Sequence, residues 1–222
     1  KGTQQITPDF IVDVNDDGFI TLNLNNGNMP ELKVAPSFAE MLDNYKTNRD
    51  SLSRREKETL IYLRDKVGKA QGFIDAVRMR RRTLTITMRA IIQMQERFFR
   101  EGDESDLRPM SLKDIAAMTG LDISTISRVC NIKYVQTKWG LFPLRFFFND
   151  SYTTDSGSLL STRKIKIALR DIIAKEDKSH PLSDETLAGI MAEKGYNIAR
   201  RTVAKYREQL NIPVARMRKK TH

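Results

Sequence analysis

The chain has few of the residues on which catalysis and metal binding most often depend. Its 222 residues include one cysteine, Cys130, and two histidines, His180 and His222. A single cysteine excludes an internal disulfide and a paired-cysteine metal site, and it fits a reducing cytosol. The sequence has no phosphate-binding glycine loop and no H-E-x-x-H pair. We therefore expect no enzyme, no metal and no cofactor, with carboxylate acid–base chemistry as the remaining catalytic alternative.

Long hydrophobic runs are also missing. No apolar stretch approaches the roughly 20 residues that span a bilayer, and no signal peptide is visible. We expect a cytoplasmic protein without a membrane partner. The apolar content of 40% is low and the charged content of 30% is high, which predicts small helical cores joined by exposed connectors.

Positive charge is abundant and unevenly placed. The formal net charge is +10; residues 1–44 carry two basic and seven acidic side chains, whereas residues 178–222 carry ten basic and four acidic ones. This asymmetry favours an acidic start that faces protein and a basic end that faces nucleic acid. From charge alone, an ordinary solvated surface is an equal alternative.

The segment "PDFIVDVNDDGFITLNL", residues 8–24, predicts a β-hairpin with its turn at "NDDG". Asp13, Asn15 and Asp17 also have the spacing of the start of an EF-hand loop. A calcium site needs a closing carboxylate, and Leu24 stands in its place. We therefore prefer the hairpin to a metal site.

Two helical patterns follow. Ser53 and Glu56 form a capping box that begins a helix reaching about Val67, and a longer pattern runs from Phe73 towards Gly102. The second contains the basic tract "RMRRR". Its arginines can lie along phosphates or form a solvated helix face, and the sequence leaves both open: Arg78, Arg80, Arg81 and Arg82.

A helix-turn-helix is predicted next. The capping box Ser111–Asp114 begins a short helix, Gly120 can end it, and Asp122 or Ser124 can cap a second helix reaching Lys133. Two short helices joined by a turn with glycine are typical of this motif. With the basic composition we prefer DNA binding to a generic helical hairpin.

The last part of the chain repeats this plan. "NDSYTTDSGSLLST", residues 149–162, has the composition of a flexible linker. We expect helices over 163–175 and from Ser183 to Gly195, then a basic helix that contains "ARRTVAKYRE", with Pro213 ending the regular structure.

In that basic helix, Val203, Tyr206 and Leu210 share one face, which can pack on the preceding helices. Arg200 and Arg201 lie in the first turn, where recognition helices present side chains to base edges. Lys205 and Arg207 are expected to contact phosphates.

"ARRTVAKYRE" resembles the signature box of the bacterial sigma-54 class of transcription initiation factors. Other segments resemble the same family in the same order: "ITPDFIVDV" the end of its core-polymerase-binding region, "MSLKDIAAMTGLDISTISRV" its helix-turn-helix, "KYVQTKWGLFPLRFFF" the segment after it, and "PLSDETLAGIMAEKG" the helix before the box. The resemblance covers nearly the whole chain.

The resemblance implies a bacterial, nucleoid-associated factor that binds core RNA polymerase and directs it to minus-24/minus-12 promoters. Transcription would depend on a separate ATP-hydrolysing AAA+ activator. The box would read the minus-24 element through Arg200, Arg201, Thr202, Lys205, Tyr206 and Arg207. The helix-turn-helix would engage the minus-12 region through Ser124, Thr125, Ser127, Arg128, Lys133 and Lys138.

A stand-alone helix-turn-helix repressor is the alternative. Such repressors usually bind palindromes as symmetric dimers, whereas two different readers on one chain suit an asymmetric site with two unlike elements.

The sequence departs from the family in two ways. The family begins with a Gln-rich regulatory segment that meets the activator, and these residues do not include one, so we expect a C-terminal part of such a factor. Lys138 and Trp139 also stand where the family usually has Pro-Arg, which leaves Lys138 as the local positive charge.

Together these patterns predict a mainly α-helical fold. The expected parts are a core-polymerase-binding part with the hairpin over 1–70, a long connecting helix over 71–102, a helix-turn-helix domain over 103–150, a linker over 151–162, and a separate three-helix, helix-turn-helix-like DNA-binding domain over 163–222.

Overall fold

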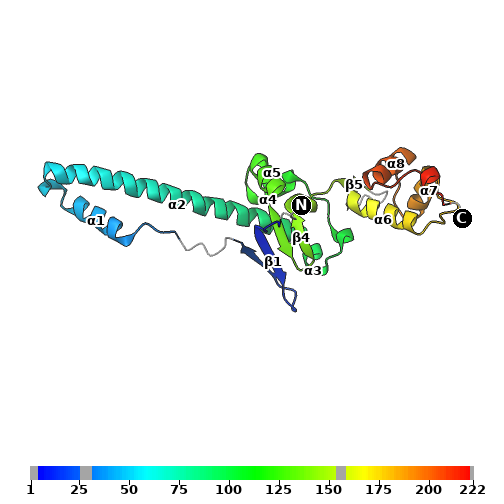
Figure 1. Ribbon diagram of the computed structural model, residues 1–222, viewed down its shortest axis with the longest axis horizontal. Coiled ribbons are helices and arrows are strands. Elements are labelled where there is room, and N and C mark those ends of the chain that lie inside the picture. The colour runs from blue at the N-terminus through cyan, green and yellow to red at the C-terminus, as the bar shows by residue number, and fades with distance from the viewer. Residues whose placement is uncertain (1–4, 26–31, 154–158, 221–222) are drawn as a thin grey trace. The chain divides into compact units, whose positions relative to one another are not determined.

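The computed structural model describes residues 5–25, 32–153 and 159–220 (Figure 1). Its contacts divide the chain into two compact units, one formed by residues 24–86 and one by residues 1–23 together with 87–222. The mainly helical fold with a hairpin near the N-terminus is confirmed. No helix in the described part of the chain combines the length and the apolar character that crossing a membrane requires.

The unit of residues 24–86 is a pair of helices. Helix α1 (Pro36–Thr47) and the 3-10 turn η1 (Arg49–Ser51) precede helix α2 (Arg54–Met94), whose first part belongs to this unit. The Ser53–Glu56 capping box is present: the Ser53 N–H donates to Glu56 Oε2 over 2.7 Å, and the Glu56 N–H to Ser53 Oγ over 3.3 Å. The small core consists of Leu42, Leu60 and Leu63, and the partly buried side chains of Tyr45, Leu52 and Val67 pack against it.

Helix α2 is continuous, so the expected boundary near residue 70 is wrong. Gly68 and Gly72 lie inside the helix and do not end it. An interior glycine costs about 1 kcal/mol relative to alanine, which the strong helix formers around it can offset. The long helix begins at Arg54 and not at residue 71.

The far end of α2 is pinned by a buried amide. Gln95 leaves helical geometry with φ −111° and separates α2 from α3 (Glu96–Glu101), which ends at Gly102 with φ +74°. The Gln95 amide nitrogen donates to the carbonyls of Arg108 and Phe147, each over 2.9 Å, and its oxygen accepts from the Arg108 N–H over 2.8 Å. All three contacts reach across the chain and fix the surrounding loop.

The N-terminal hairpin belongs to the helix-turn-helix part and not to a separate domain over 1–70. Strands β1 (Phe10–Val14) and β2 (Ile20–Leu24) join β3 (Tyr134–Thr137) and β4 (Gly140–Pro143) in one sheet of order β2-β1-β3-β4. Strand β1 pairs with β3 in parallel, with Phe10 opposite Val135. The Asp9 carboxylate fixes this register by accepting from the Tyr134 N–H over 3.0 Å. A parallel pair 125 residues apart leaves no local sequence signal.

A cluster of phenylalanine rings forms the core beside this sheet. The 3-10 turn η3 (Leu144–Phe147) supplies two of these rings, and the 3-10 turn η2 (Glu104–Asp106) follows α3 along the chain. Neighbouring ring centroids lie 4.5–6.2 Å apart, in stacked and edge-to-face arrangements. The cluster consists of Phe98, Phe99, Phe142, Phe146 and Phe147.

The C-terminal module begins inside the expected linker. Strands β5 (Ser151–Thr153) and β6 (Leu159–Ser161) pair at its two ends, while residues 154–158 lie outside the described part. Helices α6 (Thr162–Ala174), α7 (Asp184–Glu193) and α8 (Arg200–Gln209) follow. Regular structure does not end at Pro213, because the short helix α9 (Ala215–Arg218) comes after it. The core of the module consists of Ile165, Leu169, Ile173, Leu187, Met191, Ile198 and Val203.

Candidate nucleic-acid interface

Helices α4 (Leu112–Thr119) and α5 (Ile123–Ile132) form the helix-turn-helix. A reciprocal capping box begins α4, with the Ser111 N–H donating to Asp114 Oδ2 over 2.8 Å and the Asp114 N–H to Ser111 Oγ over 3.3 Å. Gly120 ends α4 with φ +70°, a conformation that favours glycine. Ile126 is fully buried. The motif is therefore packed as the sequence predicts.

The predicted contact residues of α5 lie on its outer and flanking positions. The helix begins at Ile123 with Asp122 as N-cap, so Ser124 is its second residue and not its cap. Ser124 and Arg128 are exposed, whereas Thr125 and Ser127 are half-buried. The Arg128 Nε donates to the Ser124 carbonyl over 3.3 Å, which holds the guanidinium along the helix surface.

The other two predicted residues of this region differ in availability. Lys133 Nζ lies 3.2 Å from Asp9 Oδ1, and its side chain is 20% exposed. This internal ion pair neutralises its charge and leaves it poorly placed for DNA. Lys138, in the β3–β4 turn, is exposed with its Nζ 5.3 Å from the centre of the Trp139 ring. The indole N–H donates to the Phe99 carbonyl over 2.9 Å, so the tryptophan fastens this turn to α3.

The first turn of α8 presents two free arginines. Arg200 and Arg201 are exposed, and among the described residues neither guanidinium has an ion-pair or hydrogen-bond partner. The N-cap residue, Ala199, provides no side-chain cap for the helix N–H groups. Thr202, next to them, is half-buried.

The second half of the box corrects the sequence-based prediction. Lys205 is exposed, as a phosphate contact requires. Tyr206 is half-buried against the module core, with Lys166 Nζ 5.4 Å from its ring centre. Arg207 is only 3% exposed and is bonded to Asp184 and to the Ile212 carbonyl. Arg207 is therefore a structural residue and not a phosphate contact, because its charge is used inside the module.

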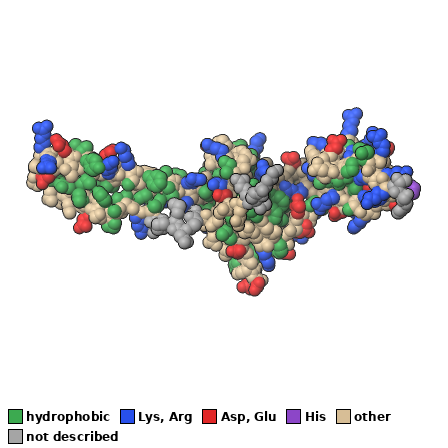
Figure 2. All heavy atoms as spheres, viewed as in Figure 1, with side chains coloured by type: hydrophobic (Ala, Val, Ile, Leu, Met, Phe, Trp, Pro, Cys, Tyr) green, Lys and Arg blue, Asp and Glu red, His purple; other side chains and the backbone are tan. Residues whose placement is uncertain are grey.

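Figure 2 shows Lys and Arg side chains spread over the α6–α8 module. The basic tract of α2, in the unit of residues 24–86, consists of exposed Arg78, Arg80 and Arg82 and half-buried Arg81. In the described parts of the chain these four guanidinium groups have no acidic partner. They stay available to anions or to solvent.

Sequence reasoning missed a second set of charged residues in the C-terminal module. The Glu176 carboxylate accepts from Arg218 Nε over 2.7 Å and from Arg218 Nη2 over 3.0 Å, and it also contacts Lys178 Nζ at 3.0 Å. Arg218 also donates to the carbonyl of Leu182 over 2.8 Å. This clamp ties α9 to the loop between α6 and α7. No local pattern indicated it, because its members lie 42 residues apart.

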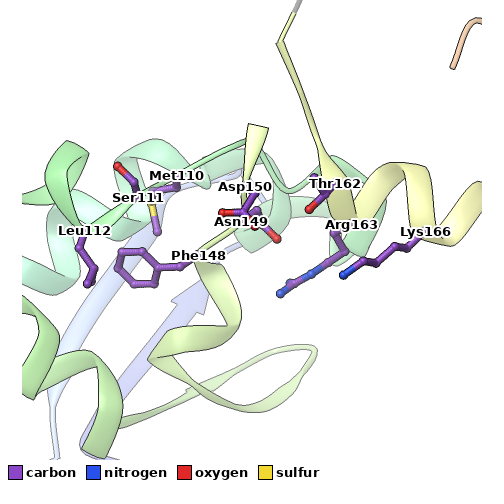
Figure 3. A pocket seen from close by; sticks show the side chains of 9 residues that line it. All are labelled: Met110, Ser111, Leu112, Phe148, Asn149, Asp150, Thr162, Arg163 and Lys166. Carbon is purple, nitrogen blue, oxygen red and sulfur yellow. The ribbon is translucent and has the colours of Figure 1, made fainter. Parts of the chain in front are cut away.

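A cavity of about 400 Å³ lies between the helix-turn-helix and α6 (Figure 3). Arg163 and Lys166 extend into it from α6, opposite Ser111 and Asn149. Neither basic residue was predicted as functional. Both lie in the helix that the sequence predicts over 163–175.

The single cysteine, Cys130, is buried in helix α5. Burial raises the pKa of the Cys130 thiol to about 12, which leaves it protonated and unreactive. In the described segments, no group of three or more His, Cys, Asp or Glu side chains is placed to hold a metal ion. At residues 15–19 the Asn15 side chain accepts from the Phe19 N–H over 2.8 Å, which stabilises a hairpin turn.

Comparison with known proteins gives consistent matches. The family model described as "Sigma-54, DNA binding domain" matches residues 60–220. The RNA polymerase sigma-54 factor of Acidithiobacillus ferridurans is 37% identical over 220 residues, covering 99% of this chain and 44% of that protein. That of Escherichia coli strain K12 is 35% identical over 216 residues, covering 97% of this chain and 43% of that protein. The chain thus spans less than half the length of these curated relatives.

A solved structure is similar over the same span. The crystal structure of Aquifex aeolicus sigmaN bound to promoter DNA matches with a TM-score of 0.62 and 30% sequence identity, covering 99% of this chain and 62% of that chain. Because the family model matches well over half of the residues, the chain belongs to the sigma-54 family and contains its DNA-binding domain.

Proposed function

We propose that this chain is the promoter-recognising part of a sigma-54 class factor, with α8 reading a minus-24 element and α5 engaging the minus-12 region. One observation carries the proposal: Arg200 and Arg201 are exposed in the first turn of α8, and neither has a partner among the residues that the structure describes. Arg207 of the same helix is buried and paired. The free arginines are thus those that a groove-inserted helix would present first.

The chemistry of the two readers differs. A guanidinium donates two parallel hydrogen bonds to O6 and N7 of guanine, worth about 1–3 kcal/mol of discrimination. Helix α5 offers the hydroxyls of Ser124 and Thr125 and the guanidinium of Arg128, which suit polar contacts to either bases or phosphates. Lys138 adds a positive charge from the adjoining turn.

The unit of residues 24–86 supports a protein partner, which we propose is core RNA polymerase. Monomeric proteins rarely expose a contiguous apolar patch of large side chains, and Figure 2 shows hydrophobic side chains gathered over α1 and the first part of α2. Several large hydrophobic side chains of these two helices are individually exposed: Phe38, Met41, Ile61, Tyr62, Phe73 and Met79. The arginine tract at 78–82 is proposed to contact phosphates near that partner.

Activator dependence is proposed from family membership. An AAA+ ATPase would act on such a factor through the Gln-rich regulatory segment with which the family begins.

Fluorescence anisotropy on labelled duplexes tests the DNA assignment. One duplex carries minus-24 and minus-12 type elements, and its control has the minus-24 guanines replaced; both are titrated at several salt concentrations. We expect at least a tenfold loss on replacement, about 1.4 kcal/mol. Equal affinity for both duplexes would contradict base reading by α8 and leave backbone binding alone.

Polymerase binding separates a sigma factor from a stand-alone repressor. Immobilised core RNA polymerase should retain the chain, and Ile61→Asp combined with Phe73→Asp should abolish retention while leaving duplex affinity unchanged. A chain that binds the promoter duplex but not core polymerase would favour the repressor.

A further inference from the structure

Arg163, at the start of α6, makes contacts outside its own module. Its guanidinium carbon lies 4.4 Å from the centre of the Phe146 ring, and its Nε lies 3.6 Å from Glu104 Oε1. Phe146 belongs to η3 and Glu104 to η2, both in the helix-turn-helix part. The side chain is 21% exposed. One arginine therefore bridges the two DNA-binding modules.

A linker that only tethered the modules would not need this contact. Enclosing a guanidinium between modules removes it from water, and burial lowers the pKa of Arg163 while the Glu104 carboxylate raises it. Contact with the face of an aromatic ring offsets part of the desolvation. The Arg163 guanidinium keeps this position only if α6 on one side, and η2 and η3 on the other, are themselves fixed.

Both surfaces are held by local contacts. On the η2 side, the Asp103 carboxylate accepts from the Ser105 N–H over 2.9 Å, and Arg97 Nε lies 3.1 Å from Asp106. On the α6 side, the Thr162 N–H donates to the Asp150 carbonyl over 3.1 Å, and Ser161 caps the helix. Arg163 thus enters a surface that is already formed.

We propose that Arg163 is a positioning residue that locks the C-terminal module against the helix-turn-helix and so sets the promoter spacing at which α5 and α8 bind together. The inference rests on the proposed two-element function. A fixed separation makes binding of the second module intramolecular, with a high effective concentration only when the two elements are suitably spaced. A flexible linker would allow binding at many spacings, and the effective concentration of the second module at the native spacing would be lower.

Four labelled duplexes test this: each element alone, both at native spacing, and both separated by an extra half helical turn, about five base pairs. Arg163→Ala should weaken native-spacing binding about five- to tenfold and reduce the penalty for the shifted spacing, with affinity for each single element unchanged. Arg163→Lys keeps the charge but lacks the planar face, and should give a smaller loss. Arg170→Ala removes an exposed charge from the same helix and is the matched control, which should retain the spacing preference.

An unchanged spacing preference in Arg163→Ala would overturn the proposal. An equal loss on single elements would also overturn it, because Arg163 would then be a direct DNA contact or a residue needed for folding. A circular-dichroism melt of each variant shows which of these applies.

A readout without DNA keeps the positioning role separate from the two-element function. Spin labels at Lys113→Cys and Glu208→Cys report the distance between modules; Cys130 can stay, since its thiol is buried. The distance distribution should be narrow in the parent and broad in Arg163→Ala. Equal widths would overturn the lock. A narrow parent distribution together with failure to recognise either element would instead refute the proposed function alone.

Discussion

Replacing Arg207 by alanine should lower the stability of the C-terminal module, because Arg207 is an internal residue and not a DNA contact. Arg207 Nε donates to Asp184 Oδ1 over 2.9 Å, Nη2 to Asp184 Oδ2 over 3.3 Å, and Nη1 to the Ile212 carbonyl over 2.8 Å. These bonds join the first turn of α7, the end of α8 and the segment that follows. The substitution removes all three at once.

The expected cost follows from the burial of the two partners. Breaking a buried ion pair costs about 3–5 kcal/mol when the remaining charge is left in the interior. Asp184 is 22% exposed, so water can solvate part of its carboxylate and the penalty falls. We expect Arg207→Ala to lower the free energy of unfolding by about 2–4 kcal/mol. For a module of this size that corresponds to roughly 10–20 °C in Tm.

Thermal unfolding followed by circular dichroism measures the change, and Lys205→Ala is the matched control. Lys205 lies on the same helix and is exposed, so its loss should alter stability by less than about 0.5 kcal/mol. The reasoning would be refuted if Arg207→Ala kept the parent Tm and instead reduced the salt dependence of DNA binding as Lys205→Ala does.

Three further predictions concern other sites. Arg200→Ala should reduce the binding free energy by about 1–3 kcal/mol on the promoter duplex and by less on random DNA. Lys205→Ala should weaken binding to the two DNAs alike and reduce the salt slope by about one. Anisotropy titrations in which the two substitutions behave alike would contradict this division of roles. Burial raises the pKa of the Glu176 carboxyl, but hydrogen bonds from its partners outweigh this and lower it to about 2. Its contribution, about 3 kcal/mol, is present above the ordinary pKa near 4.5 and lost as pH falls from there towards 2; unfolding midpoints between pH 5 and 2 should fall more steeply in the parent than in Glu176→Gln. A Cβ at Gly102 would overlap the Trp139 ring at a positive φ, so Gly102→Ala should cost about 1–3 kcal/mol and shift Trp139 emission to the red, and an unchanged spectrum would show that the ring does not pack there.

The elements that depend on local signals could be predicted from the sequence. Both capping boxes form, the "NDDG" turn makes a hairpin, and the glycine-containing turn joins α4 to α5. These features depend on side chains three or four residues apart. The continuity of α2 through Gly68 and Gly72 was missed because a glycine lowers helix propensity without forbidding the helix.

Long-range partners could not be predicted in this way. The parallel pairing of β1 with β3 and the clamp between Glu176 and Arg218 join segments that carry no local mark of each other. Arg207 did carry a signal. It lies four residues after buried Val203 and so on the helix face that packs inward, but its charge suggested a phosphate contact.

Basic side chains with partners inside the protein count toward its net charge but not toward its charge interactions with DNA. Arg207 and Arg218 are buried and each is paired with a carboxylate, half-buried Lys133 is paired with Asp9, and Arg163 lies between two modules. Each such pair adds nothing to counterion release, because its charge is already neutralised. The salt dependence of promoter binding should therefore follow the exposed arginines and lysines of α5, α8 and the β3–β4 turn. It should be smaller than the count of basic residues in the C-terminal module implies, and the substitutions that reduce it should be those of exposed side chains alone.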